Sequence, residues 1–289
     1  MGMIALDCGD DFATWRDQAR QLLGHGIDPA TVTWGQARMD DLLAVPTPLP
    51  AGPGPFRARV PAALLAQLEQ AGRYRGEQRW NLLYEVLWRV AHGDRTAMLA
   101  GDRLGSEMQR RIRQVGREAH HLHAFVRFVP LPEVLAEQLQ LDLVAYHEPA
   151  HDILDSACGH FADRLGRQRW LIATPLDGVR FDGQHLDYRR QCPQEWRQWA
   201  RNAEDPGVEL WLAYYRHTFN PTRLNPGALR QHLPGRFWRH LPEGPLIPEL
   251  VGQARHGKQR DGQALEVGRQ RGKRIASAGP SIRPNELNL

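Results

Sequence analysis

The stretch "DLVAYHEPAHDILDSACGHFADRLGRQRWLIATP", residues 142–175, decides the fold that the sequence predicts. Its two ends, 142–148 and 169–175, are short apolar runs of the kind that form strands. The segment between them, 149–166, has apolar residues at helical spacing, and Pro149 suits the first turn of a helix. The stretch therefore predicts a strand, a helix and a second strand in that order.

Further strand-like runs lie on both sides of this stretch, at 123–131 and 179–188. The order strand, strand, helix, strand, strand predicts an α+β protein, with an antiparallel sheet of about four or five strands and a helix on one face. The sequence lacks the long strand–helix alternation and the glycine-rich phosphate loop of a doubly wound nucleotide-binding fold.

The sequence pattern predicts mainly helices on both sides of the sheet. Before the sheet, strand-like runs at 3–8 and 31–34 accompany helical patterns at 10–26, 61–74, 79–93 and 102–123. After the sheet, 210–244 predicts a helical block. The expected divisions are a small strand–helix element at 1–43, a proline-rich linker at 44–56, a main domain at 57–251 and a disordered tail at 252–289.

The basic character of the chain resides in its tail. The formal net charge is +4, but residues 252–289 hold eight Lys or Arg and three Asp or Glu, a net of +5, which leaves −1 for residues 1–251. Because 35 of the 37 cationic residues are arginine, arginine abundance alone is weak evidence for nucleic-acid binding. The positions where arginines gather are more informative.

Several classes of protein are not supported by the sequence. No apolar run approaches the 18 residues or so that a membrane-spanning helix needs, and the N-terminus lacks the pattern of a secretory signal. The three cysteines are far apart and odd in number, which favours a reducing compartment over a disulfide framework. We therefore expect a cytoplasmic protein that has no contact with a membrane.

The segment 210–242, here called the Arg–aromatic block, is the clearest candidate for a binding surface. It contains six aromatic residues and no acidic residue. Its nucleic-acid candidates are Arg216, Arg223, Arg230, Arg236, Arg239 and Trp238. Arginines grip phosphates with paired hydrogen bonds, and aromatic rings stack on exposed bases, so the block predicts nucleic-acid or nucleotide contact. Helix-core packing of the aromatic residues is the alternative.

A second basic stretch runs from Arg103 to Arg127, with six arginines and two glutamates. An apolar stripe marks it as an amphipathic helix, and Arg110, Arg111, Arg113 and Arg117 are expected largely off that stripe. These arginines form either a solvated face or a surface that contacts phosphates, and Arg127 is a further nucleic-acid candidate.

The segment "HEPAHD", 147–152, has the letters of a zinc-protease motif. That motif needs a helix on which both histidines share one face, and Pro149 opposes a helix interior at this point. A zinc site is thus the least favoured alternative, and we expect no metal and no cofactor. Glu148 and His151 could still serve as a catalytic acid–base pair in a cleft.

Four segments of the sequence together suggest a family. These are "HAFVRF" (123–128), "HEPAHDIL" (147–154), "RWLIATP" (169–175) and the region from "LWLAYYRHTFNPTRLNP" to "IPEL" (210–250). They resemble the bacterial family of probable DNA metabolism proteins over roughly residues 1–250. That family is a domain of unknown function, encoded beside radical-SAM putative DNA modification or repair proteins and fused to UdgX-type uracil-DNA glycosylases. It supplies no established catalytic residues.

The resemblance implies a nucleic-acid-binding accessory protein in DNA repair or modification. Its partners would be DNA, or another nucleic acid, and the radical-SAM protein encoded nearby. The alternative is an enzyme that modifies or hydrolyses nucleic acid with Glu148 and His151. A module that only assembles with other proteins is a third class, in which the Arg–aromatic block would be packed inside.

Overall fold

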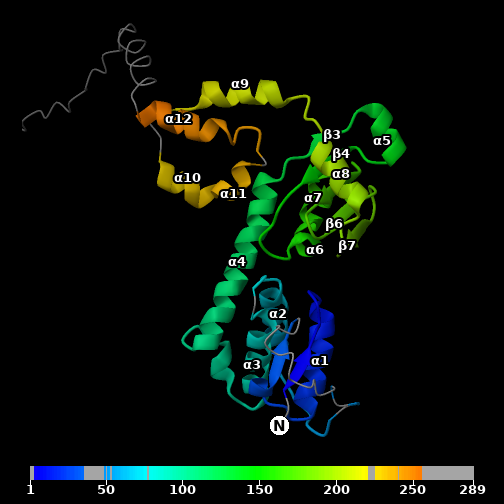
Figure 1. Ribbon diagram of the computed structural model, residues 1–289, viewed down its shortest axis with the longest axis vertical. Coiled ribbons are helices and arrows are strands. Elements are labelled where there is room, and N and C mark those ends of the chain that lie inside the picture. Colours follow the sequence, from blue (N-terminus) through cyan, green and yellow to red (C-terminus); the bar gives the residue numbers. More distant parts are fainter. Residues whose placement is uncertain are drawn as a thin grey trace, which may run out of the picture. The chain divides into compact units, whose positions relative to one another are not determined.

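The structure is a computed structural model, and it describes residues 3–35, 49, 51–52, 54–76, 78–220, 225–239 and 241–255 (Figure 1). The chain divides into two compact units, Met1–Asp205 and Pro206–Leu289. This division lies within the segment 57–251 that the sequence suggested as one domain. Most of the proline-rich segment 44–56 lies outside the described residues, as does the tail from 256 onward.

The first unit begins with a small layer of strands and helices. The strands β1 (Ile4–Leu6) and β2 (Val32–Trp34) pair in parallel. The helix α1 (Phe12–Gly24) begins at Asp11, whose carboxylate accepts a hydrogen bond from the Thr14 amide at 2.8 Å and thereby satisfies one free N–H of the first turn. The helices α2 (Ala62–Gly72) and α3 (Arg79–Ala91) follow, as predicted, with short 3₁₀ turns at Pro29–Thr31 and Arg95–Met98.

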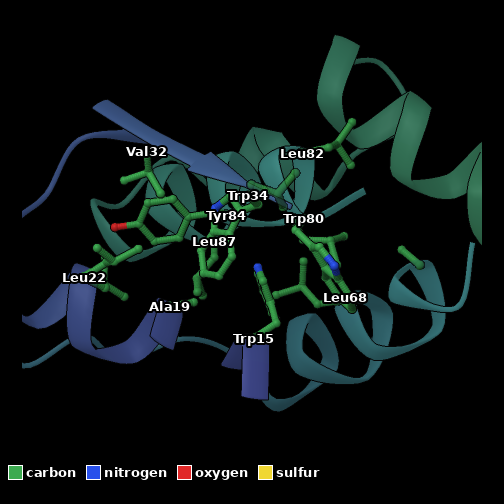
Figure 2. Packing of buried hydrophobic residues seen from close by; sticks show 14 of the residues in the cluster. Trp15, Ala19, Leu22, Val32, Trp34, Leu68, Trp80, Leu82, Tyr84 and Leu87 are labelled. Atoms are coloured by element: carbon green, nitrogen blue, oxygen red, sulfur yellow. The ribbon is translucent and has the colours of Figure 1, made fainter. Parts of the chain in front are cut away.

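A core rich in tryptophan holds this layer together. Figure 2 shows side chains from α1, β2, α2 and α3 that converge on one apolar cluster. The Trp15 and Trp80 rings stack with their centroids 5.8 Å apart, and Trp34 meets Tyr84 edge to face at 6.0 Å. The Tyr84 hydroxyl donates to the Ile27 carbonyl at 2.7 Å, so this buried phenol keeps a hydrogen-bond partner.

The long helix α4 (Arg103–Phe125) joins this core to the rest of the first unit (Figure 1). It begins at Asp102, whose carboxylate accepts hydrogen bonds from the amides of Leu104 and Gly105. Leu104 and Met108, near its start, are buried in the tryptophan-rich core. Val115 and Leu122, farther along, are buried in a second core against the sheet. One helix thus contributes to two cores.

The main sheet has five strands in the order of the chain: β3 (Val129–Pro130), β4 (Leu143–Tyr146), β5 (Trp170–Ala173), β6 (Gly178–Phe181) and β7 (Leu186–Arg189). Three of its four pairings are antiparallel, which confirms the predicted α+β class. The exception is β4 with β5, a parallel pair in which Val144 lies opposite Leu171.

Helices cover both faces of this sheet. Alternate strand residues point to opposite faces, so Ala145 and Trp170 pack with α4, α6 (Leu154–Ala157) and α7 (Gly159–Leu165). Val144 and Leu171 point the other way, toward α8 (Gln194–Asn202). The sequence predicted a helix on one face; α8, and the short helix α5 (Glu133–Leu139) after β3, were not predicted.

The prediction of one helix over 149–166 was wrong at its start and in its continuity. Residues 149–153 are not helical, and the helical part is divided into α6 and α7 at Cys158. A tertiary contact takes the place of the first helical bond: the amide of Asp152, which would bond to the Glu148 carbonyl in a helix from Pro149, donates to the Arg73 carbonyl at 2.9 Å. The amide of Ala150 also donates to the Glu118 carboxylate, at 2.7 Å. Similarly, α4 continues to Phe125, so that only Val129–Pro130 of the predicted strand 123–131 pairs in the sheet.

The second unit is helical, as predicted. It contains α9 (Val208–Thr218), α10 (Pro226–His232), α11 (Gly235–Trp238) and α12 (Leu246–Arg255). Its buried apolar side chains are Phe237, Leu241, Leu246, Ile247 and Leu250. The helix α12 reaches Arg255, so the first residues of the predicted tail are helical. No helix among the described residues is long and apolar enough to cross a bilayer.

Candidate functional site

The arginines of the Arg–aromatic block lie at the surface of the second unit. Arg216 is in the last turn of α9, Arg230 is in α10, Arg236 is in α11 and Arg239 follows α11; all four are exposed. A cation in the last turn of a helix is also favoured by the helix dipole. Arg223 lies outside the described residues. The described arginines of the block are therefore on the surface, where a phosphate can reach them.

The aromatic residues of the block have mixed roles. Trp211 is half-buried, and its indole donates to the carboxylate of Glu243 at 2.8 Å; Glu243 itself is only 7% exposed. Burial, and to a lesser extent Glu243, raises the pKa of Tyr215. Tyr214 points outward, with 58% of its surface exposed. The helix α9 therefore packs through Trp211 and Tyr215 and offers Tyr214 to solvent.

Trp238 is less available than the sequence suggested. It is half-buried, and its indole N–H donates to the Leu233 carbonyl at 3.1 Å. The neighbouring Phe237 is buried, and the guanidinium of Arg236 lies 4.6 Å from its ring centroid. Tyr214 is therefore better placed than Trp238 to stack its ring on a ligand.

The basic stretch on α4 is partly committed to the fold. Arg110 and Arg111 both donate to Glu107, at 2.6 and 2.9 Å, and both lie over the ring of Tyr74. The hydrogen bonds from Arg110 and Arg111 lower the pKa of Glu107 to about 2. Arg111 is buried, contrary to the expectation that it lies off the apolar stripe.

The remaining cations of this stretch are more accessible. Arg113 and Arg117 are exposed on α4. Arg127, the nucleic-acid candidate of this stretch, is half-buried in the connection between α4 and β3. Only part of the predicted basic face is therefore open to a ligand.

Glu148 and His151 lie in the connection between β4 and α6, and the two side chains have different neighbours. The Glu148 carboxylate accepts a hydrogen bond from the Tyr146 hydroxyl at 3.0 Å and lies 3.8 Å from the Arg201 guanidinium. The ring of His151 packs on Tyr74 with centroids 4.5 Å apart. An acid–base role for the pair stays a prediction.

A group of arginines fastens this connection to the N-terminal layer. Asp152 accepts hydrogen bonds from Arg75 at 2.7 Å and from Arg79 at 2.8 Å, and Arg79 also pairs with Asp10. Arg79 is 5% exposed, so its charge depends on these carboxylates. Ion pairs therefore join the connection to the N-terminal layer, and we call Asp152, Arg75 and Arg79 the ion-pair cluster, in which Arg79 is buried and the other two are half-buried.

No zinc-protease helix forms here, because His147 to His151 do not lie on a helix. Among the described residues, no group of three or more His, Cys, Asp or Glu side chains is arranged to hold a metal ion. The three cysteines are free and buried.

A polar hollow on α8 is a feature that the sequence reading missed. It has a volume of about 440 Å³, and its lining residues are Pro175, Gln194, Arg197, Gln198, Arg201 and Asn202. Trp196 and Ala200 of the same helix are buried against the sheet. The spacing of the polar residues against these buried ones was a readable signal of an amphipathic helix after Pro193.

Comparison with known protein families places most of the chain in one of them. A family described as a domain of unknown function, DUF4130, matches residues 77–243, more than half of the chain. The matched region contains the connection from 147 to 153, the hollow on α8 and the whole Arg–aromatic block. No curated protein and no solved structure matches the chain.

Proposed function

The chain belongs to the DUF4130 family, and from that premise we propose that it binds nucleic acid through the Arg–aromatic block. The observation that carries the proposal is the exposure of Arg216, Arg230 and Arg236 on helices of one small unit, and of Arg239 directly after one of them. Exposed guanidinium groups attract phosphates and form paired hydrogen bonds with them.

The charge of the block supports the same function. No acidic residue occurs in the sequence between 210 and 242, so every formal charge within the block is positive. Glu243, which follows it, is buried and accepts the hydrogen bond of Trp211. A packed block, as expected of a module that only assembles with proteins, would instead bury its arginines against carboxylates.

The wider role that we propose is that of an accessory protein in DNA repair or modification, which presents DNA to a radical-SAM partner enzyme. Its basis is the resemblance of the quoted motifs to the probable DNA metabolism proteins. A pull-down with the radical-SAM protein encoded nearby, with and without DNA, tests this role. Capture that requires DNA, or that DNA strengthens, supports it, and failure to capture in both conditions refutes it.

Binding itself is tested with substitutions in the block. We expect Arg236→Ala to weaken the binding of a labelled DNA oligonucleotide by about 1–3 kcal/mol, the scale of a charge-assisted contact, and to leave the melting temperature nearly unchanged. The same is expected for Arg223→Ala. The matched control is Arg189→Ala on β7, an exposed arginine of the first unit whose partner is Asp187. Equal effects of Arg236→Ala and Arg189→Ala on affinity would exclude the block as the binding surface.

A further inference from the structure

The side of α8 that lines the hollow is made of guanidinium and amide side chains; Glu195 is also exposed on this helix but is not among the lining residues. Gln194, Arg197, Gln198, Arg201 and Asn202 follow one another at intervals of three or one residues, so they lie along one side of the helix. The opposite side, with Trp196 and Ala200, is buried on the sheet. The polar side therefore faces outward as a continuous stripe, and with Pro175 it lines the hollow of about 440 Å³.

Both arginines of this hollow donate hydrogen bonds to neutral oxygens that lie in the sheet or next to it. The guanidinium of Arg197 donates to the Pro175 carbonyl at 3.2 Å. The guanidinium of Arg201 donates to the Tyr146 hydroxyl and lies 4.4 Å from the Tyr146 ring centroid. Each guanidinium has five N–H groups, and these contacts use only part of them. An arginine that is already oriented loses less entropy when it binds an anion.

The charge of the hollow favours an anion. None of the described residues that line it is acidic, and two of them are arginines. The carboxylate of Glu148 lies 3.8 Å from the guanidinium of Arg201, which is close to the upper limit for an ion pair. Arg197 is farther along the stripe from this carboxylate by one helical turn, so its charge is the better placed to serve a ligand.

We infer that the hollow on α8 binds a phosphate group, either of a nucleic-acid backbone or of a free nucleotide. Arginines one helical turn apart can share a single phosphate, and the amides of Gln194, Gln198 and Asn202 both donate and accept hydrogen bonds, as a sugar or base edge requires. The volume is within the range of sites for small ligands. This site lies wholly in the first unit and is independent of the Arg–aromatic block.

The experiment uses the full chain and three probes. Deoxyadenosine monophosphate and deoxyadenosine are titrated by calorimetry, and a labelled DNA oligonucleotide is titrated by fluorescence anisotropy. If the source of the phosphate is a free nucleotide, the monophosphate binds and the nucleoside does not. If the source is a nucleic-acid backbone, the oligonucleotide alone shows the effect of substitutions in the hollow.

Three substitutions at two positions probe the hollow, with Arg189→Ala as the matched control. Arg197→Ala should weaken the phosphate-bearing probe about tenfold or more, as the loss of a charge-assisted hydrogen bond does, and Arg197→Lys should recover part of the affinity. Gln198→Glu adds a negative charge at an exposed position and should also weaken binding, whatever happens to the fold of the arginine variant.

The outcomes separate this inference from the proposed function. Unchanged binding of every probe by Arg197→Ala and Gln198→Glu overturns the phosphate site, even if Arg236→Ala weakens DNA binding. If the α8 variants bind more weakly and Arg236→Ala has no effect, the phosphate site is supported and the Arg–aromatic block is excluded as the nucleic-acid-binding surface. No binding of any probe overturns both.

Discussion

Asp152 makes the sharpest test of how the connection after β4 is held. The substitution Asp152→Asn keeps the shape of the side chain but removes its charge from Arg75 and Arg79. Arg79 is 5% exposed and would retain Asp10 as its carboxylate partner, whose side chain is 58% exposed. After the change, the buried guanidinium of Arg79 has one carboxylate partner where it had two, and the partner that remains, Asp10, is exposed to solvent.

The expected cost follows from that arrangement. Removal of one partner from a buried ion pair typically costs about 3–5 kcal/mol, because an uncompensated charge stays buried. Two effects reduce it here: Asp10 remains, and the asparagine oxygen can still accept one hydrogen bond. We expect a loss of about 2–3 kcal/mol, which for a unit of this size lowers the melting temperature by roughly 4–12 °C.

The control is Asp155→Asn, a matched change three residues later. Asp155 pairs with Arg73, and the two side chains are 35% and 20% exposed, so solvent screens the pair far better. A surface pair of this kind contributes about 0–1 kcal/mol. Urea unfolding followed by tryptophan fluorescence measures both variants. If the two substitutions lower the free energy of unfolding equally, or if Asp152→Asn lowers it by less than about 1 kcal/mol, the ion-pair cluster does not stabilise the fold.

Two further predictions concern acid stability and the kind of nucleic acid bound. Because the pKa of Glu107 is lowered in the folded state from 4.5 to about 2, its contribution to stability is present above pH 4.5 and is lost as the pH falls toward 2. The variant Glu107→Gln should therefore be less stable than the wild type at pH 6 and should lose less stability between pH 4.5 and 2. The midpoints of urea unfolding, measured across this pH range, test both expectations. Exposed Tyr214 can stack on unpaired bases, so Tyr214→Ala should weaken single-stranded DNA by about 1–3 kcal/mol and duplex DNA much less; equal losses in anisotropy titrations would contradict stacking.

The sequence predicted the elements whose pattern is local. The helices α1, α3 and α4 have apolar residues at helical spacing, and the strands β4 and β5 are compact apolar runs, so each could be placed from its own residues. The parallel pairing of β4 with β5 could not be placed in this way, because it depends on how the chain between them returns to the sheet.

The predictions that were wrong failed for a similar reason: each depended on contacts with residues far away in the sequence. The helix expected from Pro149 does not form there because the amide of Asp152 bonds to the carbonyl of Arg73, which is remote in sequence, in place of the Glu148 carbonyl. Arg111 is buried because Tyr74, from another part of the chain, covers it. The sequence left open whether the Arg–aromatic block is exposed, because the same aromatic spacing suits a packed helix and a binding surface; in the structure Trp211 and Tyr215 of α9 are half-buried and Arg216 is exposed.

The position of α4 in two cores has a consequence for synthesis of the chain on the ribosome. The tryptophan-rich core can close once Leu104 and Met108 have emerged, because its other members precede them. Val115 and Leu122, on the same helix, belong to a core that is complete only when Trp170, Ile172 and Phe181 have also been made. During that interval the growing chain displays an apolar stripe next to a finished core. Such surfaces attract chaperones or other nascent chains, so slow translation between 125 and 181 would increase the yield of aggregated protein.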